Sequence, residues 1–405
     1  MSIPHSSNKT PIVFAHLYAF LLILFIPFPF YVFPFQIDLT SFLFSDLLTY
    51  SVNIFFGNQA GYQEINSDSP QMYLLFVLLL FISAVITFIS AYIKRWETIK
   101  PRVIYLIRSL IICYLVTILF KYGFDKIFKK QFYIPEPNIL YTPLGQLDKD
   151  ILYWSTIGTS YTYSLITGIL EVLTAGLILM RRTRTIGLIM SIGLLLNILL
   201  INISFNISVK LFTCYLIFLS VLILAPKIPG ILRFFLDKKP IEPQIEIGLK
   251  NVVPSFPVRV SIITFIIGII LIESLYPHVS SRNFNDDKAE RPYLHGAYEV
   301  ISTDPDSVGA APVHRIFIHR NGYLIFQNNK DEMHDYKLQI DSIQHLLVLT
   351  DYDLKSYSLK YATTFDGLQI EYFMEGKRYF LNTKRLDWQN LPALKDEFDW
   401  VDRGK

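Results

Sequence analysis

The stretch GILEVLTAGLILMRRTRTIG, from Gly168 to Gly187, decides which kind of protein this chain is. Apolar residues fill most of the run, but it contains one carboxylate, Glu171, and ends in three arginines at positions 181, 182 and 184. About 20 mainly apolar residues are needed to cross roughly 30 Å of hydrocarbon, so the run fits a membrane span with a basic end. A simple membrane anchor does not explain the glutamate.

The whole chain has the composition of a membrane protein. Of its 405 residues, 52% are hydrophobic and 18% are charged, and the mean hydropathy is +0.37. Soluble domains carry about 25% charged residues. The net charge is only +3, and no long run of Lys or Arg could follow a phosphate backbone, which argues against nucleic acid as a partner. The two cysteines, Cys113 and Cys214, lie in apolar runs and show neither zinc-type nor disulfide spacing.

Seven apolar runs are long enough to be transmembrane helices. The first is too long for a secretion signal, so we expect it to be retained as a span. Prolines at positions 27, 29 and 34 should kink or end that helix, because each removes a main-chain donor. The predicted spans are Ile12–Phe35, Met72–Ile93, Val103–Tyr122, Trp154–Met180, Thr185–Ser204, Ile207–Ala225 and Val260–Tyr276.

The distribution of Lys and Arg between the spans predicts the orientation. Residues 94–102, 181–184 and 227–250 are basic, whereas residues 36–70 contain no Lys or Arg. Basic links lie in the cytoplasm, so the amino terminus should be cytoplasmic and everything after Tyr276 outside the plasma or inner membrane, in the exoplasm or periplasm. Residues 123–150, with four lysines, form the one link that disagrees.

Beyond Tyr276 the sequence takes on a β pattern. RIFIHRNGYLIFQN (Arg315–Asn328) consists of two β-rich runs around Asn321-Gly322, a strong hairpin signal. Short strands that alternate apolar and polar residues predict a small antiparallel barrel or sandwich. The predicted fold class is therefore an α-helical membrane protein of about seven spans with an all-β extramembrane domain at the carboxyl end.

Glu171 shares a helix face with Ser160, Ser164, Gly168 and Ala175, all small residues. Such a stripe lets a second helix approach closely, so Glu171 should point into a helix bundle. It lies about 15 Å from Arg181 along the helix, near the middle of the bilayer, where a carboxyl group is expected to be neutral.

Two interpretations of Glu171 stay open. It could be structural, with a hydrogen bond to Asn197, Asn202 or Lys210 on the following spans, or it could line a polar cavity that binds a ligand or relays a proton. Two interpretations of the neighbouring arginines also stay open. Arg182 and its neighbours could anchor the helix among lipid headgroups, or they could bind a specific anionic ligand.

The middle of the chain resembles the DoxX-like membrane family. The resemblance covers roughly Arg102 to Leu236, and its most specific part is the GxxE…RRT block that begins at Gly168. The similar segments are YGFDKIFKKQF (Tyr122–Phe132), PLG (143–145), YWSTIGTSYTYSLITGILEVLTAGLILMRRTRTIG (Tyr153–Gly187), NILLINISFNISVKLF (Asn197–Phe212) and AP (225–226).

This resemblance implies a four-helix bundle made of the third to sixth spans and a link to thiosulfate or quinone redox systems or to oxidative-stress responses. A quinone is the only cofactor that it implies, and the histidines show no metal-ligand spacing. The leading spans, the extra trailing span and the β domain depart from a simple four-helix member. The site residues carried over by position are Tyr122, Lys126, Gln131, Phe132, Ser160, Glu171, Arg182, Asn197, Asn202 and Lys210.

The resulting domain organisation has four parts. Residues 1–100 form N-terminal spans and an exoplasmic loop, 101–236 the DoxX-like bundle, 237–277 a cytoplasmic link and the seventh span, and 290–405 the exoplasmic β domain. The expected function is a non-catalytic binding or scaffold role in the lipid bilayer, with a polar intramembrane site around Glu171. The alternative is the membrane component of a quinone-linked or oxidative-stress oxidoreductase system, acting with a redox or envelope partner protein.

Overall fold

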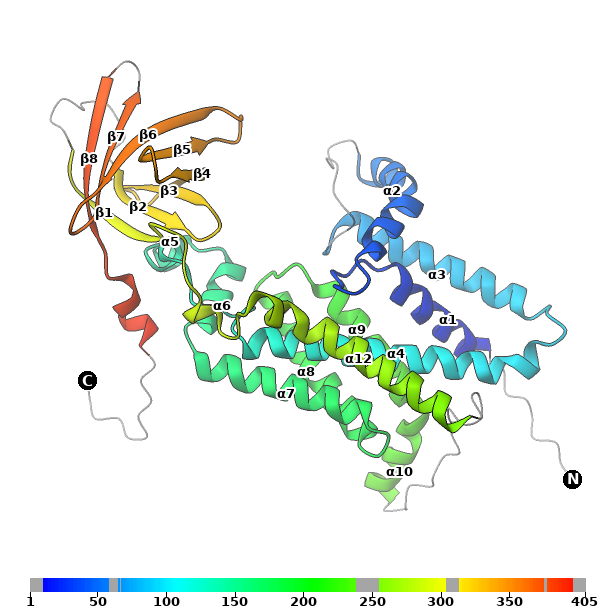
Figure 1. Ribbon diagram of the computed structural model, residues 1–405. Helices are drawn as coiled ribbons and strands as arrows, with labels where there is room; N and C mark the ends of the chain where they lie inside the picture. The colour runs from blue at the N-terminus through cyan, green and yellow to red at the C-terminus, as the bar shows by residue number, and fades with distance from the viewer. Residues whose placement is uncertain are drawn as a thin grey trace, which may run out of the picture. The chain divides into compact units, whose positions relative to one another are not determined.

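The computed structural model describes residues 10–57, 65, 67–237, 255–303, 313–374 and 377–395. The chain divides into two compact units. The helical unit comprises Met1–Gln131 and Leu165–Phe284, and the barrel unit comprises Phe132–Ser164 and Asn285–Lys405 (Figure 1).

The helical unit has the surface of a membrane protein. Seven helices in the described part of the chain are long and apolar enough to cross a membrane, namely α2, α3, α4, α7, α8, α9 with its continuation, and α12. Large apolar side chains such as Phe42, Phe81 and Phe265 are 65% or more exposed, as expected for residues that face lipid. The helices are α1 (Thr10–Phe25), α2 (Phe35–Phe56), α3 (Pro70–Ser90), α4 (Trp96–Ile127), α7 (Tyr161–Leu179), α8 (Arg184–Ser204), α9 (Lys210–Leu224), α10 (Ile228–Asp237) and α12 (Phe256–Ser281).

The predicted first span, Ile12–Phe35, is wrong. Helix α1 ends at Phe25, because Pro27, Pro29 and Pro34 cannot donate main-chain hydrogen bonds. A separate helix, α2, then occupies the segment predicted to be an exoplasmic loop. Asp38, Asp46 and several serines interrupt its apolar residues, so its hydropathy is the lowest of the seven candidate helices, which is why the sequence predicted a loop there.

The predicted span Trp154–Met180 is also divided. It consists of α6 (Lys149–Gly158), which belongs to the barrel unit, and α7. Ser160 lies at the break, and its side-chain oxygen accepts a hydrogen bond from the main-chain nitrogen of Tyr163 at 3.2 Å, which caps the start of α7. The five remaining predicted spans correspond to α3, α4, α8, α9 and α12.

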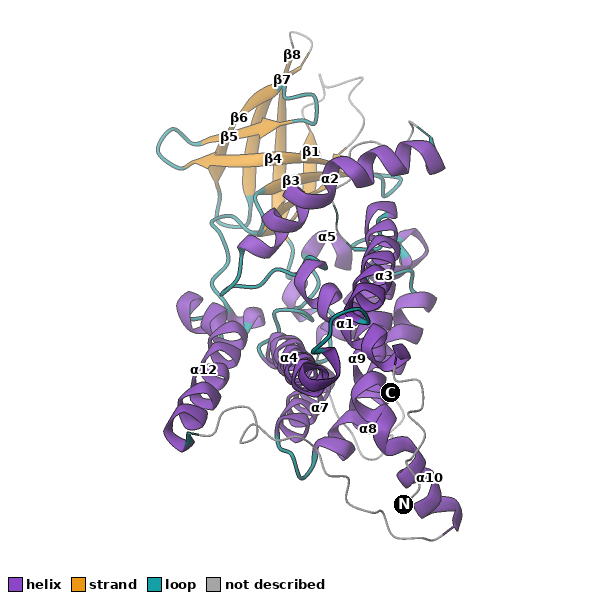
Figure 2. Cartoon of the chain, turned by 90° about the vertical axis from the view of Figure 1, so that its right-hand side faces the viewer, coloured by secondary structure: helices purple, strands orange, loops and turns teal. Residues whose placement is uncertain are grey.

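Helix α2 runs in a different direction from its neighbours. In Figure 1, α1, α3 and α4 run in similar directions. In the turned view of Figure 2, α4 is seen nearly end-on and α2 lies across at almost full length. Its buried residues, among them Thr40, Leu48 and Val52, occupy one side of the helix, and Phe42, Leu47 and Tyr50 are exposed.

The carboxyl-terminal domain is a closed antiparallel barrel in which each strand pairs with the next and β1 pairs with β8. The predicted hairpin is present, with His319 paired to Tyr323 and Gly322 in the turn at φ +73°. Apolar side chains, among them Ile316, Leu347 and Ile370, fill the interior. The strands are β1 (Gly296–Thr303), β2 (Val313–His319), β3 (Tyr323–Asn328), β4 (Met333–Asp341), β5 (Leu346–Thr350), β6 (Ser356–Thr363), β7 (Leu368–Met374) and β8 (Lys377–Arg385).

A second apolar core lies on the outside of this barrel. Phe317 and Trp388 are buried there against Ile134, Leu140 and Tyr141, and the last two flank the end of the short helix α5 (Pro137–Leu140). The ring of Tyr141 stacks on that of Phe317 at 6.0 Å. Residues 132–164 therefore group with the barrel, whereas the sequence placed them in the bundle at 101–236.

Candidate functional site

Helices α4 and α7 cross at two glycines. A Cβ atom on Gly168 would lie 2.6 Å from the carbonyl oxygen of Gly123, and one on Gly123 would lie 2.8 Å from Val172 Cγ2. Only glycine allows the two main chains to approach this closely. Ser164 and Ala175, which the sequence places on the same face, are fully buried.

The buried charge of Glu171 lies one turn beyond this crossing. Lys126 Nζ donates to both carboxylate oxygens of Glu171, at 2.9 and 2.8 Å, and the two residues are 6% and 4% exposed. The ammonium group also lies 5.6 Å from the centre of the Tyr122 ring. Glu171 thus faces protein, as the small-residue stripe predicts. Its partner is Lys126, which the sequence analysis did not name as a partner of Glu171.

The residues predicted as structural partners of Glu171 make other contacts. Asn202 donates to Thr213 Oγ1 at 3.0 Å, and Asn197 is exposed on α8. Lys210 starts α9, where Asp68 accepts from the main-chain nitrogens of Lys210 and Leu211 at 3.0 and 2.9 Å. A carboxylate at a helix amino terminus satisfies free donors and complements the helix dipole.

The remaining predicted site residues are dispersed. Gln131 is half-buried after α4, Phe132 packs on Trp154 with the ring centres 5.2 Å apart, and Arg182 is exposed. Phe132 and Ser160 belong to the barrel unit, and Arg182 lies in the α7–α8 turn. Of the ten predicted residues, the structure brings Tyr122, Lys126 and Glu171 together.

A second buried carboxylate, Glu273 on α12, was missed. It is 1% exposed and accepts from the main-chain nitrogens of Tyr31 and Val32, both at 2.8 Å, and from Lys121 Nζ at 3.0 Å. The signal was present in the sequence, because Glu273 is a lone carboxylate within the predicted seventh span.

The last two turns of α4 are therefore a centre of charge pairing. Lys121 pairs with Glu273 of α12 and Lys126 pairs with Glu171 of α7. Between them, Asp125 lies 3.2 Å from His278 Nε2, also of α12. Placing lysines near a helix carboxyl terminus is favourable, since the free carbonyl groups there carry partial negative charge.

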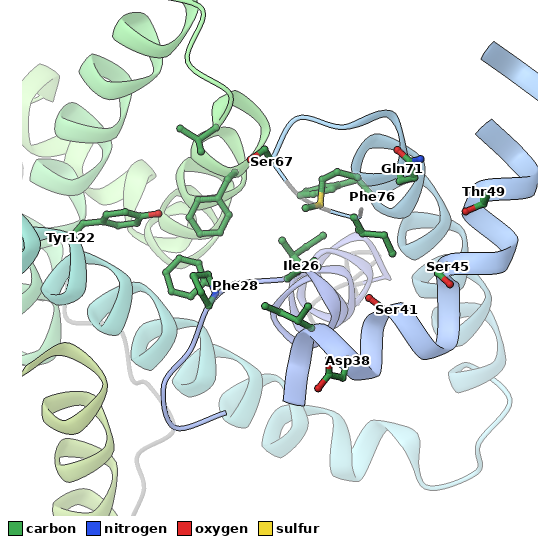
Figure 3. A pocket seen from close by; sticks show the side chains of 17 residues that line it. Ile26, Phe28, Asp38, Ser41, Ser45, Thr49, Ser67, Gln71, Phe76 and Tyr122 are labelled. Atoms are coloured by element: carbon green, nitrogen blue, oxygen red, sulfur yellow. The ribbon is translucent and has the colours of Figure 1, made fainter. Parts of the chain in front are cut away.

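A cavity of 480 Å³ opens beside this centre, which we call the α2 cavity (Figure 3). Ser41, Ser45 and Thr49 succeed one another at helical spacing along α2 and form its polar side. Phe28, from the turn between α1 and α2, and Tyr122 lie on the opposite side in Figure 3. The cavity therefore has one polar wall and one mainly aromatic wall.

Gln71, in the first turn of α3, also lines the α2 cavity. It is 2% exposed, and its Oε1 atom has no hydrogen-bond partner among the described residues. A buried polar atom left without a hydrogen bond costs about 1–3 kcal/mol. The wall of the α2 cavity therefore contains a buried amide oxygen that has no partner among the described residues.

The charge centre holds the wall of the α2 cavity in place. Glu273 binds the main chain of Tyr31 and Val32, just after the segment that lines the cavity. Lys121, the other partner of Glu273, has its Nζ atom 5.8 Å from the centre of the Phe28 ring. The ion pair and the cavity are therefore parts of one site.

The barrel unit has its own buried charge cluster around Glu136. This residue is 4% exposed, and its carboxylate accepts from His295 Nε2 at 2.8 Å and lies 3.1 Å from Arg320 Nε. Burial alone would raise the pKa of Glu136, but the hydrogen bond from His295 and the charges of His319 and Arg320 outweigh it and lower this pKa. Burial lowers the pKa of His319 more than the nearby Glu136 raises it.

Both pKa shifts predict that acid destabilises the barrel unit. The folded state binds protons less readily than the unfolded state, so stability is lost as the pH falls below 6.5 for His319 and below 4.5 for Glu136. The protection factors of amide hydrogens in β1 and β2 of the full-length protein, which correct for the intrinsic pH dependence of exchange, should therefore be lower at pH 5 than at pH 7. His319→Gln should weaken this dependence, and replacement of the exposed His334 should not. Equal protection factors at both pH values would contradict the prediction.

Comparison of the chain with protein-family models, with curated proteins and with solved structures gives no match. Within the described residues, no group of three or more His, Cys, Asp or Glu side chains could hold a metal ion. The DoxX-like resemblance therefore stays a prediction.

Proposed function

We propose that this protein is a non-catalytic, multi-pass membrane protein that binds an amphiphilic molecule in the α2 cavity. Helices α4, α7, α8 and α9 would form its DoxX-like scaffold, held by the Lys126–Glu171 pair. The observation that carries the proposal is a cavity with a polar and an aromatic wall, in which the buried amide oxygen of Gln71 has no partner among the described residues. The sequence predicted a polar intramembrane site around Glu171. This proposal instead assigns the binding site to the α2 cavity, on the other side of Tyr122.

The proposed topology follows from the basic links and from the direction of α2. The turns α3–α4 and α7–α8, and the link from α9 to α12, carry the basic residues, so we assign them to the cytoplasm. The axis of α1 is roughly aligned with those of α3 and α4, so α1 would cross the membrane as they do. Its amino terminus would then be inside. Helix α2 would then lie in the outer interface, and the barrel would be outside the cell or inner membrane.

The shape and chemistry of the α2 cavity favour an amphiphile. Its 480 Å³ falls within the range of about 300–1,000 Å³ that is typical of small-molecule sites. The hydroxyl groups of Ser41, Ser45 and Thr49 and the amide of Gln71 can bind a polar group. The aromatic rings of Phe28 and Phe212, stacked 5.5 Å apart, offer an apolar wall.

Filling the cavity tests the proposal. In Ser41→Phe the new ring would occupy the space of the ligand, so binding of lysophosphatidylcholine to the purified protein should weaken by about tenfold. Native mass spectrometry of the protein in mild detergent measures the occupancy. Asn53→Phe, on an exposed position of the same helix, is the matched control and should bind as the wild type does. Equal occupancy in Ser41→Phe and wild type would contradict the proposal.

The alternative function, a component of a quinone-linked oxidoreductase system, would use the same cavity. The hydroxyl group of Tyr122 and the ring of Phe28 are suited to hydrogen bonding and stacking with a quinone head. Decylubiquinone that displaces lysophosphatidylcholine from wild type, but binds weakly to Ser41→Phe, would favour this alternative.

A further inference from the structure

A pocket of 430 Å³ lies on the outside of the barrel, over the paired strands β3 and β4. Tyr323 of β3 and Met333 and Asp335 of β4 line it, together with His319 at the end of β2 and Tyr352 in the loop between β5 and β6. These residues all belong to the barrel unit. We call this site the tyrosine pocket.

Asp335 gives the tyrosine pocket a negative charge. No Lys or Arg is among the described lining residues. The hydroxyl group of Tyr352 donates to Asp335 Oδ2, and within the described part of the chain no basic side chain forms an ion pair with this carboxylate. Lys337, the next residue of β4 on the same face, is exposed to solvent. The hydrogen bond from Tyr352 fixes the position of the carboxylate without cancelling its charge.

Two aromatic rings, those of Tyr323 and Tyr352, lie in the same pocket. The ring of His319 packs at 75° to that of Tyr323, with the ring centres 6.2 Å apart. Tyr352 is tied to Asp335 through its hydroxyl group. The faces of such rings attract a cation that lies within about 6 Å of the ring centre. The pocket therefore combines a carboxylate with two surfaces that favour positive charge.

The surroundings of the pocket are also favourable for a cation. Burial lowers the pKa of His319 below its usual value of 6.5, so this ring is uncharged at pH 7 and does not repel a cation. The β3–β4 and β5–β6 loops lie at the same end of the barrel, and residues 329–332 and 351–355 contain four acidic and two basic residues. An excess of negative charge around a site raises the local concentration of cations.

We propose that the tyrosine pocket binds a small, water-soluble organic ammonium ion. Asp335 would be its counter-charge, and the rings of Tyr323 and Tyr352 would contact the ammonium group and the carbon atoms next to it. The volume of 430 Å³ is within the range of about 300–1,000 Å³ that is typical of small-molecule sites. The barrel unit contains none of the seven long apolar helices, which favours a soluble amine over a lipid. The inference goes beyond the proposed function, because it does not depend on the α2 cavity.

Titration of the full-length protein in mild detergent with butylammonium chloride, followed by ligand-observed NMR at constant ionic strength, tests this proposal. Butylammonium should bind to wild type more tightly than butanol, which has a similar shape but no charge. Asp335→Asn should weaken butylammonium binding by about three- to fivefold. Asp353→Asn is the matched control, because it removes the same charge from an exposed position that does not line the pocket, and it should leave the affinity nearly unchanged.

A second pair of variants tests the aromatic contacts. Tyr352→Leu should weaken butylammonium binding by about two- to fivefold. Tyr352 is 82% exposed, so its replacement is not expected to unfold the barrel, and it tests the site even if Asp335→Asn fails to fold. Tyr357→Leu, on β6 and outside the pocket, is its control and should bind as the wild type does.

Three results would overturn the proposal: equal binding of butylammonium and butanol, equal affinities in each variant and its control, or potassium ions that displace butylammonium at similar concentration. The last result would mean that the pocket attracts any cation and recognises no organic group. Ser41→Phe leaves the tyrosine pocket intact and should bind butylammonium as the wild type does. Failure of the α2 cavity to bind an amphiphile would therefore be seen separately.

Discussion

Replacing Glu171 by glutamine is expected to lower the free energy of unfolding by about 3–5 kcal/mol, the typical cost of removing one partner from a buried ion pair. Both oxygens of Glu171 accept from Lys126 Nζ, and both residues are at most 6% exposed. A glutamine would deprive the buried lysine ammonium group of this counter-charge. The loss would be large because the low polarity of the interior does not screen such a charge.

The double variant Lys126→Met/Glu171→Gln identifies the ion pair as the cause. It removes the charge together with its partner, so its stability should lie closer to wild type than that of either single variant. Unfolding by heat and by SDS, measured on the protein in mild detergent, would give the order of the four proteins. Arg182→Gln is the control for the loss of an exposed charge and should have little effect. Single variants as stable as wild type would show that the pair does not hold α4 to α7.

Gly168→Ala is expected to destabilise the same helix contact by about 1–3 kcal/mol through overpacking. The new methyl group would lie 2.6 Å from Gly123 O and 3.0 Å from Ile127 N, both main-chain atoms that cannot move aside independently. Alanine is otherwise the better helix former by about 1 kcal/mol, so a loss of stability would reveal the steric conflict directly.

Gly176→Ala, on the same helix, is the matched control. A Cβ atom at Gly176 would have nothing within 4 Å, so this change should be neutral or stabilising by up to about 1 kcal/mol. Thermal unfolding of the two variants in the same detergent separates the effects. If Gly168→Ala and Gly176→Ala behaved alike, the close crossing of α4 and α7 would be refuted.

The fold class was readable from the sequence because its signals are local. Long apolar runs, the basic links between them and the Asn321-Gly322 turn depend only on neighbouring residues, and they predicted both the helical and the β part. Helix α2 was missed because its polar residues face a cavity that only the folded protein forms. The break near Ser160 was missed although Ser, Thr and Gly make up most of residues 155–164, and the side chain of Ser160 caps the start of α7.

The candidate site was predictable in part for the same reason. The spacing of Gly168, Glu171 and Ala175 on one helix predicted which face is buried. The identity of the partner helix was not predictable, because Lys126 and Glu171 are 45 residues apart and several polar residues were equally suitable. The α2 cavity could not be predicted at all, since its walls come from the α1–α2 turn and from α2, α3, α4 and α9.

The charge pairs of α4 also constrain how the ribosome and the insertion machinery can build this protein. Lys121 and Lys126 emerge before either acid that neutralises them, and Glu273 is 152 residues further along the chain than Lys121. Until α12 is synthesised, Lys121 near the carboxyl end of α4 lacks the Glu273 carboxylate with which it pairs in the folded protein. We therefore expect this end of α4 to stay in contact with water or an insertase until α12 is inserted.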